Sequence, residues 1–383
     1  MRWSVVVSAA VAALVGLGGT LAILVAAAQA VGADAAETSS WVSSLCLATA
    51  LASFGLSLRH RIPVVTAWST PGAALIASMP GQVGFSAAIG AFLFAGILVL
   101  LTAAVRPLGT LIERIPGSLA GAMLAGILLR FVAAVFDSAE TLPALVLPLL
   151  ALFLVVRLFT AAGAVLSVLA AGIALAYGLG LAPPWPGGPA LSTLVLTMPS
   201  FEVAALIGLG LPLFLVTMAS QNLPGFAVLR AAGYAVPSRS ILAATGLVSI
   251  LTAPFGAHAT NAAAITASIC TGPDAHPDAS KRWLAGVAYG ICFALLAAFG
   301  TSLTSFFQAM PPALIVTVAG CALIAPLAGA LGTAMAAPEE RIAAALTLAV
   351  TASGAGFLGI GSAFWGLAAG LAVTGLGVAR RRL

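Results

Sequence analysis

Long apolar stretches, separated by short breaks at charges, Pro–Gly clusters and polar turns, run along almost the whole chain. A helix needs about 20 residues to cross a hydrocarbon core about 30 Å thick, so stretches of this length predict membrane spans. Dividing the chain at the breaks gives fourteen segments: 6–31, 41–58, 62–79, 82–104, 116–135, 142–157, 161–181, 201–223, 239–252, 253–270, 283–305, 311–331, 340–356 and 358–379. The pattern therefore predicts an all-α polytopic membrane protein.

Composition agrees with this pattern and excludes a soluble protein. Of the 383 residues, 62% are hydrophobic and 7% charged, whereas soluble domains have roughly a quarter of their residues charged. The formal net charge is +5, but the basic residues are scattered singly between apolar runs, which favours cytoplasmic loops and not nucleic-acid binding. The four cysteines show no metal-ligand spacing, so neither a metal site nor a disulfide framework is expected. No cofactor-binding motif or catalytic constellation is present, so an enzyme is not expected.

Basic residues determine the predicted orientation. With the N-terminus inside, 14 of the 15 Lys and Arg residues fall in cytoplasmic loops or termini. This predicts that both termini are cytoplasmic. The exception, Arg130, is interpreted as a partner of Asp137, and Glu202 as the N-terminal cap of the eighth segment. The apolar stretch from Val5 to Gly32 is longer than the roughly 7–15 residues of a signal-peptide core, so we interpret it as a retained first span.

Two pairs of segments match at similar offsets, which indicates an internal repeat. The first segment matches the eighth at an offset of 192, with residues 12–18 over residues 204–210. The third matches the tenth at an offset of 190, with residues 67–74 over residues 257–264. Because seven segments per copy is an odd number, the second copy must insert upside down. Inverted repeats of this kind are typical of secondary transporters.

The third and tenth segments each predict a short extended stretch followed by a half-helix. In the third, residues 62–68 favour extended chain, and Ser69 followed by Pro71 predicts a capped helix start. In the tenth, residues 253–258 are predicted to be extended, and Thr260 to cap a helix that continues to the end of the segment.

Inversion of the repeat would bring the two half-helices together. Their N-termini, near Thr70 and Thr260, would approach each other at mid-membrane from opposite sides. Each N-terminus has free N–H groups and about half a positive charge. Two such ends at a water-filled cavity predict an anion site without a buried Lys or Arg. The alternative is that both segments are only kinked structural helices.

Polar residues in these spans are candidates for coupling and binding. His258 is the only His in a predicted span, and its imidazole suits proton exchange near neutral pH. We predict that His258 couples transport to protons; the alternative is a structural hydrogen bond to the crossing backbone. Gln221 and Asn222, together with Thr217, lie where the eighth segment must loosen, and they could bind a ligand or join helices.

Aromatic residues complete the predicted site. Trp68 and Phe255 flank the predicted cavity and could stack on a ring, and Asn261 could donate to a carboxylate. The candidate substrate-binding residues are Trp68, Ser69, Thr70, Gly72, Thr217, Gln221, Asn222, Phe255, His258, Thr260 and Asn261.

Three stretches of the chain, residues 66–74, 217–225 and 254–267, resemble motifs of the bacterial benzoate/proton symporter family (BenE type). The resemblance extends over essentially the whole chain. It implies an aromatic carboxylate as substrate, proton symport by an elevator-like motion, and a location in a bacterial inner membrane. One difference is that uracil permeases, which the family resembles in architecture, bring a carboxylate from the eighth segment to the substrate, whereas this chain has Gln221 and Asn222 there. An uncharged site suits an anionic ligand.

The resemblance also implies a division into two parts that move against each other. The implied core is formed by residues 1–104 and 182–305, and the implied gate by residues 105–181 and 306–383. The implied partners are an aromatic carboxylate, protons and the lipid bilayer, and a homodimer follows from analogy alone.

The residues leave other functions open. A carrier of another planar compound, such as a nucleobase, or an exporter would use similar spans. A channel-like anion pathway would also fit, but its uptake would neither saturate nor drive proton movement. A purely structural protein is not expected, because broken spans at matched positions serve no scaffold.

Overall fold

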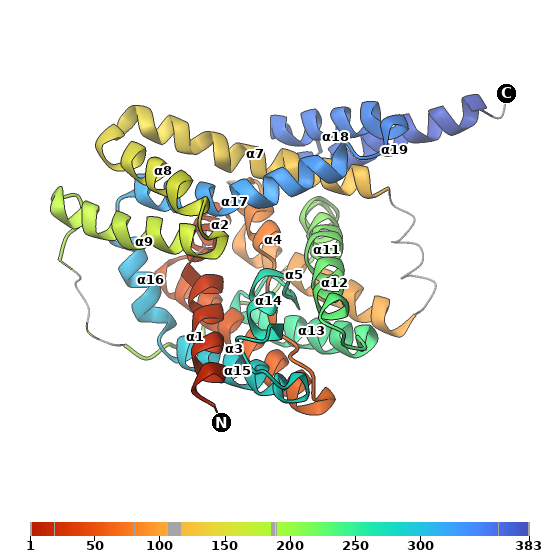
Figure 1. Ribbon diagram of the computed structural model, residues 1–383. Coiled ribbons are helices and arrows are strands. Elements are labelled where there is room, and N and C mark those ends of the chain that lie inside the picture. Colours follow the sequence, from red (N-terminus) through yellow and green to blue (C-terminus); the bar gives the residue numbers. More distant parts are fainter. Residues whose placement is uncertain are drawn as a thin grey trace.

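The protein is described by a computed structural model over residues 2–18, 20–79, 81–105, 116–184, 188, 190–358 and 360–381. These residues form mostly helices, which we divide into two groups (Figure 1). In Figure 1 the second group, α7–α9 and α17–α19, lies across the top of the first group, α1–α5 and α10–α16.

The first group contains the N-terminal helices and the middle of the chain. Its helices are α1 (Trp3–Gly18), α2 (Leu21–Ala30), α3 (Ala35–His60), α4 (Thr70–Ala77), α5 (Phe85–Ala104), α10 (Val203–Ala205), α11 (Leu211–Thr217), α12 (Leu223–Ala231), α13 (Ser238–Thr252), α14 (Ile265–Thr271), α15 (Trp283–Ala298) and α16 (Gly300–Gln308). Short 3₁₀ turns cover Ala253–Phe255 and Ala279–Lys281. Fully buried large side chains such as Trp41, Phe92 and Phe293 fill the core of this group.

The second group has a hydrophobic cluster of its own. Its helices are α7 (Gly117–Thr141), α8 (Pro143–Arg157), α9 (Ala161–Gly178), α17 (Pro312–Ala334), α18 (Arg341–Ser353) and α19 (Ser362–Arg381), with a 3₁₀ turn at Pro338–Glu340. Leu149 of α8, Val168 of α9 and Val318 of α17 are buried together. These three helices therefore pack as a unit.

Eight helical stretches in the described residues are long and apolar enough to cross a membrane. They are Trp3–Ala30, Ala35–His60, Phe85–Ala104, Gly117–Thr141, Val203–Ala231, Ser238–Phe255, Ala279–Ala298 and Pro312–Ala334. Shorter apolar helices cover Pro143–Arg157, Gly163–Gly178 and Ser362–Leu376. The protein is thus a polytopic membrane protein by length and composition, and the count of fourteen crossings stays a prediction.

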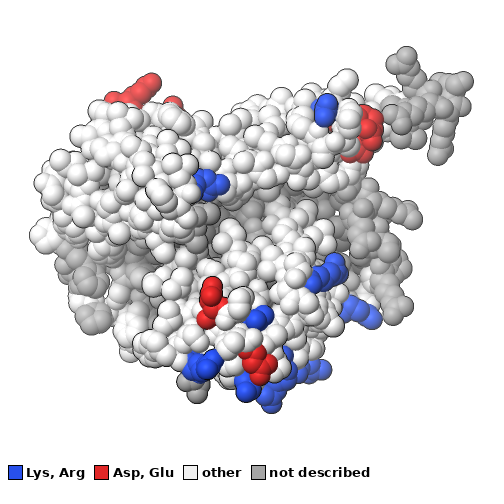
Figure 2. Space-filling model, in the orientation of Figure 1, with Lys and Arg blue, Asp and Glu red and all other residues white. Residues whose placement is uncertain are grey.

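Charged side chains are sparse on the surface. In Figure 2 most blue atoms lie along the lower edge, near the end of α3 and the start of α15, and the face above them is almost uncharged. Arg106 and Arg114, predicted to share a cytoplasmic loop, lie outside the described residues. The predicted pairing of Arg130 with Asp137 is wrong, because the guanidinium Nη1 of Arg130 instead donates to the carbonyl oxygen of Ser78, 3.2 Å away, at the C-terminal end of α4.

The two predicted broken segments meet in a two-stranded antiparallel ladder. Strand β1 (Thr66–Trp68) pairs with β2 (Thr260–Ala262), with Ala67 opposite Asn261. The ladder continues at both ends, since Ser69 N–H donates to Ala259 O and Ala263 N–H to Val65 O. Extended backbone inside a membrane protein must satisfy its hydrogen bonds within the protein. Here the two segments pair with each other along the ladder, and the N–H groups that face away from it donate to side chains: Thr66 to Ser53, Thr260 to Ser249 and Ala262 to Asn222.

Helix α4 begins at the predicted place. It runs from Thr70, and Ser69 is its N-cap, with its hydroxyl oxygen accepting from Gly72 N–H at 3.1 Å. Pro71 is the second residue of the helix, where its missing N–H costs nothing.

The prediction for the tenth segment is wrong in two respects. The first three of residues 253–258 form a 3₁₀ turn that ends at Gly256, and Thr260 lies in β2 and does not cap a helix. Helix α14 begins only at Ile265, and its N-cap residue, Ala264, makes no side-chain cap. The reason is that β2 must stay extended to pair with β1. The strands start at Thr66 and Thr260, an offset of 194 rather than 190.

The eighth segment is loosened by two π-helical turns, at Leu206–Gly210 and Met218–Asn222. Such turns are frequent at functional sites. The second one contains the predicted Gln221 and Asn222. Glu202 is the N-cap residue of α10, but its side chain makes no cap hydrogen bond, contrary to the prediction.

Candidate functional site

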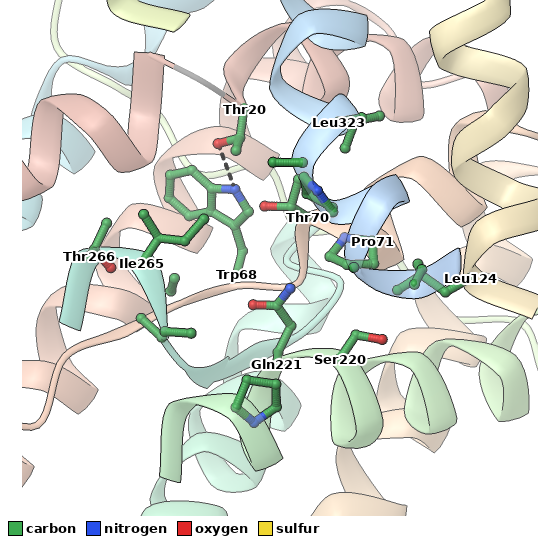
Figure 3. A pocket seen from close by; sticks show the side chains of 18 of the residues that line it. Thr20, Trp68, Thr70, Pro71, Leu124, Ser220, Gln221, Ile265, Thr266 and Leu323 are labelled. Atoms are coloured by element: carbon green, nitrogen blue, oxygen red, sulfur yellow. Dashed lines mark hydrogen bonds between the residues drawn. The ribbon is translucent and has the colours of Figure 1, made fainter. Parts of the chain in front are cut away.

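A cavity of about 730 Å³ is lined by residues from both helix groups (Figure 3). This volume falls within the roughly 300–1,000 Å³ range of small-molecule sites. Gly121 and Leu124 of α7 and Leu323 and Pro326 of α17 line it from the second group. None of the described lining residues is charged. The cavity therefore suits a small ligand that is recognised by neutral donors and apolar surface.

The first residues of both half-helices line this cavity. Thr70 of α4 and Ile265 and Thr266 of α14 are all lining residues. The backbone N–H groups of Ile265, Thr266 and Ala267 have no acceptor in the described part of the chain. At the start of α4, the Gly72 N–H donates to the Ser69 hydroxyl oxygen and Pro71 has no N–H. The donors that remain available there are the backbone N–H and the hydroxyl of Thr70. Both helix starts thus offer neutral hydrogen-bond donors.

Trp68 forms an apolar wall beside these helix starts. Its indole N–H donates to Thr20 Oγ1 at 3.0 Å, and the Thr20 hydroxyl donates in turn to Gly16 O, so the ring is held in place (Figure 3). Its ring meets Phe293 edge-on, with 5.7 Å between centroids. The predicted ring-stacking position of Trp68 is compatible with this geometry.

Gln221 is a predicted binding residue whose polar side chain lies free at the cavity. The π turn Met218–Asn222 carries it with Ser220, and both line the cavity. The Gln221 side chain extends toward Trp68 in Figure 3. Neither side chain makes a hydrogen bond with the residues that the structure describes. An amide that is half-buried and unpaired is available to a ligand.

Asn222 and Asn261 are turned away from this role. Asn222 Oδ1 accepts from Ala262 N–H at 2.9 Å, and its Nδ2 lies 3.4 Å from Met218 Sδ. In the amide orientation that satisfies both neighbours, Asn261 Oδ1 accepts from Ser69 N–H and Nδ2 donates to Ala262 O, each at 2.9 Å. Both asparagines are fully buried and outside the cavity lining, so they stabilise the crossing strands.

His258 also lies outside the cavity lining. Trp41 Nε1–H donates to its Nδ1 at 3.2 Å, so Nε2 carries the proton and donates to Ser69 O at 2.9 Å. The imidazole is fully buried, and both nitrogens are satisfied in the neutral form. The geometry matches the alternative of a structural hydrogen bond to the crossing backbone, and it joins α3 to the cap of α4.

The remaining candidates are not brought to the cavity. The prediction that Phe255 flanks it is wrong: Phe255 lies in the 3₁₀ turn, and its carbonyl oxygen accepts from Ser40 and Ser44 of α3. Other candidates are buried but do not line it, namely Ser69, Gly72, Thr217 and Thr260. No cluster of residues able to hold a metal ion occurs within the described ranges.

Comparison with known families is decisive. The family described as benzoate membrane transport protein (BenE) matches residues 1–376. The chain belongs to this family. It is therefore a transport protein and not an enzyme. This BenE-family chain is 40% identical over 361 residues to inner membrane protein YdcO of Escherichia coli (strain K12), covering 94% of the chain and 92% of that protein. It is 34% identical over 368 residues to the benzoate membrane transport protein of Acinetobacter baylyi (strain ATCC 33305 / BD413 / ADP1), covering 96% and 93%.

Solved structures show which fold the BenE-family chain has. The transmembrane domain of the cyanobacterial bicarbonate transporter BicA is similar at a TM-score of 0.59 and 12% identity, covering 97% of this chain and 98% of that one. SLC26A9 is similar at a TM-score of 0.63 and 14% identity, covering 98% of this chain and 65% of that one. At such identities the similarity shows the fold alone.

Sequence reasoning missed several lining residues of the BenE-family chain. Thr20, Thr266 and Tyr289 line the cavity, as do Leu124 and Pro326 from the second group. Tyr289 stands out in an apolar stretch as one of only three tyrosines, and this could have marked it. The apolar residues carry no such signal, because nothing in the sequence states which helix face meets the other group.

Proposed function

We propose that this protein takes up benzoate or a similar aromatic carboxylate together with protons across a bacterial inner membrane. One observation carries the proposal: the first residues of α4 and α14 line a single cavity that has no charged described residue and contains Trp68 and Gln221. The benzoate transport protein of Acinetobacter baylyi, 34% identical, supports the substrate class.

The site chemistry supports an anion with a ring. The unpaired amides at Ile265 and Thr266, with the donors of Thr70, would hold the carboxylate, because helix starts favour negative charge. The Gln221 amide would add a donor, and the Trp68 ring would cover the face of the substrate. With no fixed carboxylate among the described lining residues, nothing there repels the ligand.

An elevator-type motion is the mechanism that we propose for crossing. The core would be residues 1–104 and 182–305 and the gate residues 105–181 and 306–383, in fourteen segments forming two inverted repeats with both termini cytoplasmic. This division is supported by the position of the cavity, which is lined by residues of both helix groups. A binding site at the boundary between two parts can open to either side of the membrane when one part slides against the other. The fold similarity to BicA and SLC26A9 also supports it.

Uptake into proteoliposomes tests the function. Labelled benzoate should enter saturably, and an inwardly directed proton gradient should stimulate uptake. Unlabelled aromatic acids should compete, and nucleobases should not. Uptake that does not saturate would indicate a channel-like pathway, and competition by nucleobases would indicate a different substrate class.

Proton coupling is proposed to act through His258 indirectly. A second proton on the imidazole would sit on Nδ1 and oppose the Trp41 N–H that now donates to it. Protonation would therefore break the link between α3 and the start of α4. The charge change would move the half-helix without touching the substrate.

The substitution His258→Gln is expected to preserve saturable uptake down a benzoate gradient and to abolish its stimulation by a proton gradient. Glutamine can accept from Trp41 and donate to Ser69 O, but it cannot take up a proton. Uptake measured with and without a pH gradient checks this. His60→Gln is the control, since His60 binds Ser240 away from the cavity. Full stimulation in His258→Gln would place the proton carrier elsewhere.

A further inference from the structure

Arg130 of α7 connects the two helix groups at the end of α4 that is remote from the cavity. Its guanidinium Nη1 donates to the carbonyl oxygen of Ser78, 3.2 Å away, and Ser78 is the C-cap residue of α4. The same guanidinium lies against Gly354, where an added Cβ would be 2.6 Å from Nη1 and 3.0 Å from Cζ. Gly354 is the C-cap residue of α18. One cation therefore faces the C-terminal ends of two helices, one from each group.

Electrostatics favours this position for a guanidinium. The C-terminal end of a helix carries about half a negative charge, so a cation beside it is stabilised. A hydrogen bond from a charged donor is also stronger than one between neutral groups. Arg130 forms no ion pair with a carboxylate of the described residues, so its charge acts on these two helix ends.

The cavity opens at the end that lies away from Arg130. Its lining residues on α7 begin at Gly117, which is exposed, and end at Leu124, which is 6% exposed. On α17 the lining residue Thr333 is exposed near the end of the helix, whereas Leu323 is fully buried. The start of α7 and the end of α17 are the ends that the basic residues predict to face the cytoplasm. The structure thus has the cavity open on that side and closed toward Arg130.

The two groups are also in close contact beside Arg130. Gly361, in the loop between α18 and α19, lies so near the first group that an added Cβ would be 2.7 Å from Met79 Cε and 3.5 Å from Gly208 O. Met79 directly follows Ser78 at the end of α4. The hydrogen bond of Arg130 therefore belongs to the part of the boundary where the groups meet tightly.

We propose that Arg130 is a latch that holds the two helix groups together on the outer side, keeps the site open to the cytoplasm, and leaves Ser78 O each time the site opens outward. This proposal rests on the elevator motion of the proposed function. When one group slides past the other, different residues meet across the boundary, so this hydrogen bond cannot persist through the motion. Arg130 does not line the cavity, so it is a positioning residue that acts through α4.

Labelling a cysteine at position 124 from the outer side tests the latch. Leu124→Cys is introduced after removal of the four native cysteines, and sealed right-side-out vesicles are treated with a membrane-impermeant thiol reagent. Arg130→Met removes the charge and the donor but keeps a long side chain. It should raise the labelling rate about tenfold, because the loss of one charge-assisted hydrogen bond shifts a two-state equilibrium by about this factor. Arg130→Lys can still donate to Ser78 O and should restore slow labelling.

A glycine variant tests the latch without changing the charge. In Gly354→Ala the methyl group would displace the guanidinium, so labelling should rise as in Arg130→Met, and combining the two changes should give no further rise. Arg157→Met is the matched control, because Arg157 also lies on a helix of the second group but its guanidinium lies over Phe153 of the same helix. It should leave the labelling rate unchanged.

Transport separates the latch from a purely structural role. In Arg130→Met the half-saturating concentration of benzoate on the outer side should fall, because more of the protein is already open outward. The half-saturating concentration on the cytoplasmic side should not fall. A loss of fold would instead lower the maximal rate from both sides.

Three results would overturn the latch. They are unchanged labelling in Arg130→Met, an equal rise in Arg157→Met, and labelling of the unmodified protein that is faster from the outer side than from the cytoplasmic side. If the vesicles took up no benzoate, the proposed function would fail, and the labelling rates would still test whether Arg130 keeps the outer side closed.

Discussion

Replacing Gln221 with glutamate is expected to lower kcat/KM for benzoate about 100-fold at neutral pH. The carboxylate would stand in the cavity beside Trp68, where it would repel a carboxylate ligand. Two like charges about 5 Å apart at an effective dielectric constant of about 20 repel by about 3 kcal/mol, which is about 100-fold in affinity. The change of one amide for a carboxylate hardly alters the shape, so the fold should be kept.

Initial rates of labelled benzoate uptake over a range of pH check this result. Uptake by Gln221→Glu should recover as the pH falls toward the pKa of the introduced glutamate, since its protonated, neutral side chain no longer repels the ligand. Gln29→Glu in α2 is the matched control, because Gln29 is exposed and outside the cavity lining. Normal uptake by Gln221→Glu at neutral pH would show that the carboxylate does not bind near this residue.

The substitution Gly256→Ala is expected to lower the free energy of unfolding by about 2–4 kcal/mol, from backbone strain and overpacking together. Gly256 has a φ of 103°, which residues with a side chain rarely adopt. A Cβ there would also lie 2.8 Å from Trp41 Cβ. Trp41 donates a hydrogen bond to His258, and His258 donates one to Ser69 O. The disturbance should therefore extend to the start of α4.

Denaturation of the purified protein in detergent measures the effect of Gly256→Ala. Gly233→Ala is the control, because Gly233 has a φ of 86° but no atom within 4 Å of an added Cβ. In Gly233→Ala the free energy of unfolding should fall by the backbone-strain contribution alone, about 1–2 kcal/mol. Equal losses in the two variants would show that contact with Trp41 adds nothing.

Local signals predicted the parts of the site that depend on neighbouring residues. The Ser69 cap and the start of α4 follow from three adjacent residues, and both were predicted correctly. Trp68 and Gln221 line the cavity, and each sits beside a helix interruption that the sequence marks with proline. Their contact with a substrate stays a prediction.

Long-range pairing explains the errors. Threonine often caps helices, which is why Thr260 was predicted to be a cap, but the strand partner that keeps it extended lies almost 200 residues earlier. His258 looks like an isolated imidazole in the sequence, whereas its partners come from α3 and from the cap of α4. A single sequence does not show such partners, so a role at the substrate and a role in the scaffold could not be separated.

The ladder between β1 and β2 has a consequence for biogenesis. While the first half of the chain is inserted, the peptide groups of Thr66–Trp68 have no strand to pair with, because Thr260–Ala262 has not yet been synthesised. Unpaired peptide groups are costly in hydrocarbon, so the early segment must wait beside water, a chaperone or the insertion machinery. A fragment that ends before residue 260 should therefore remain a substrate for quality-control proteases, however apolar its helices are.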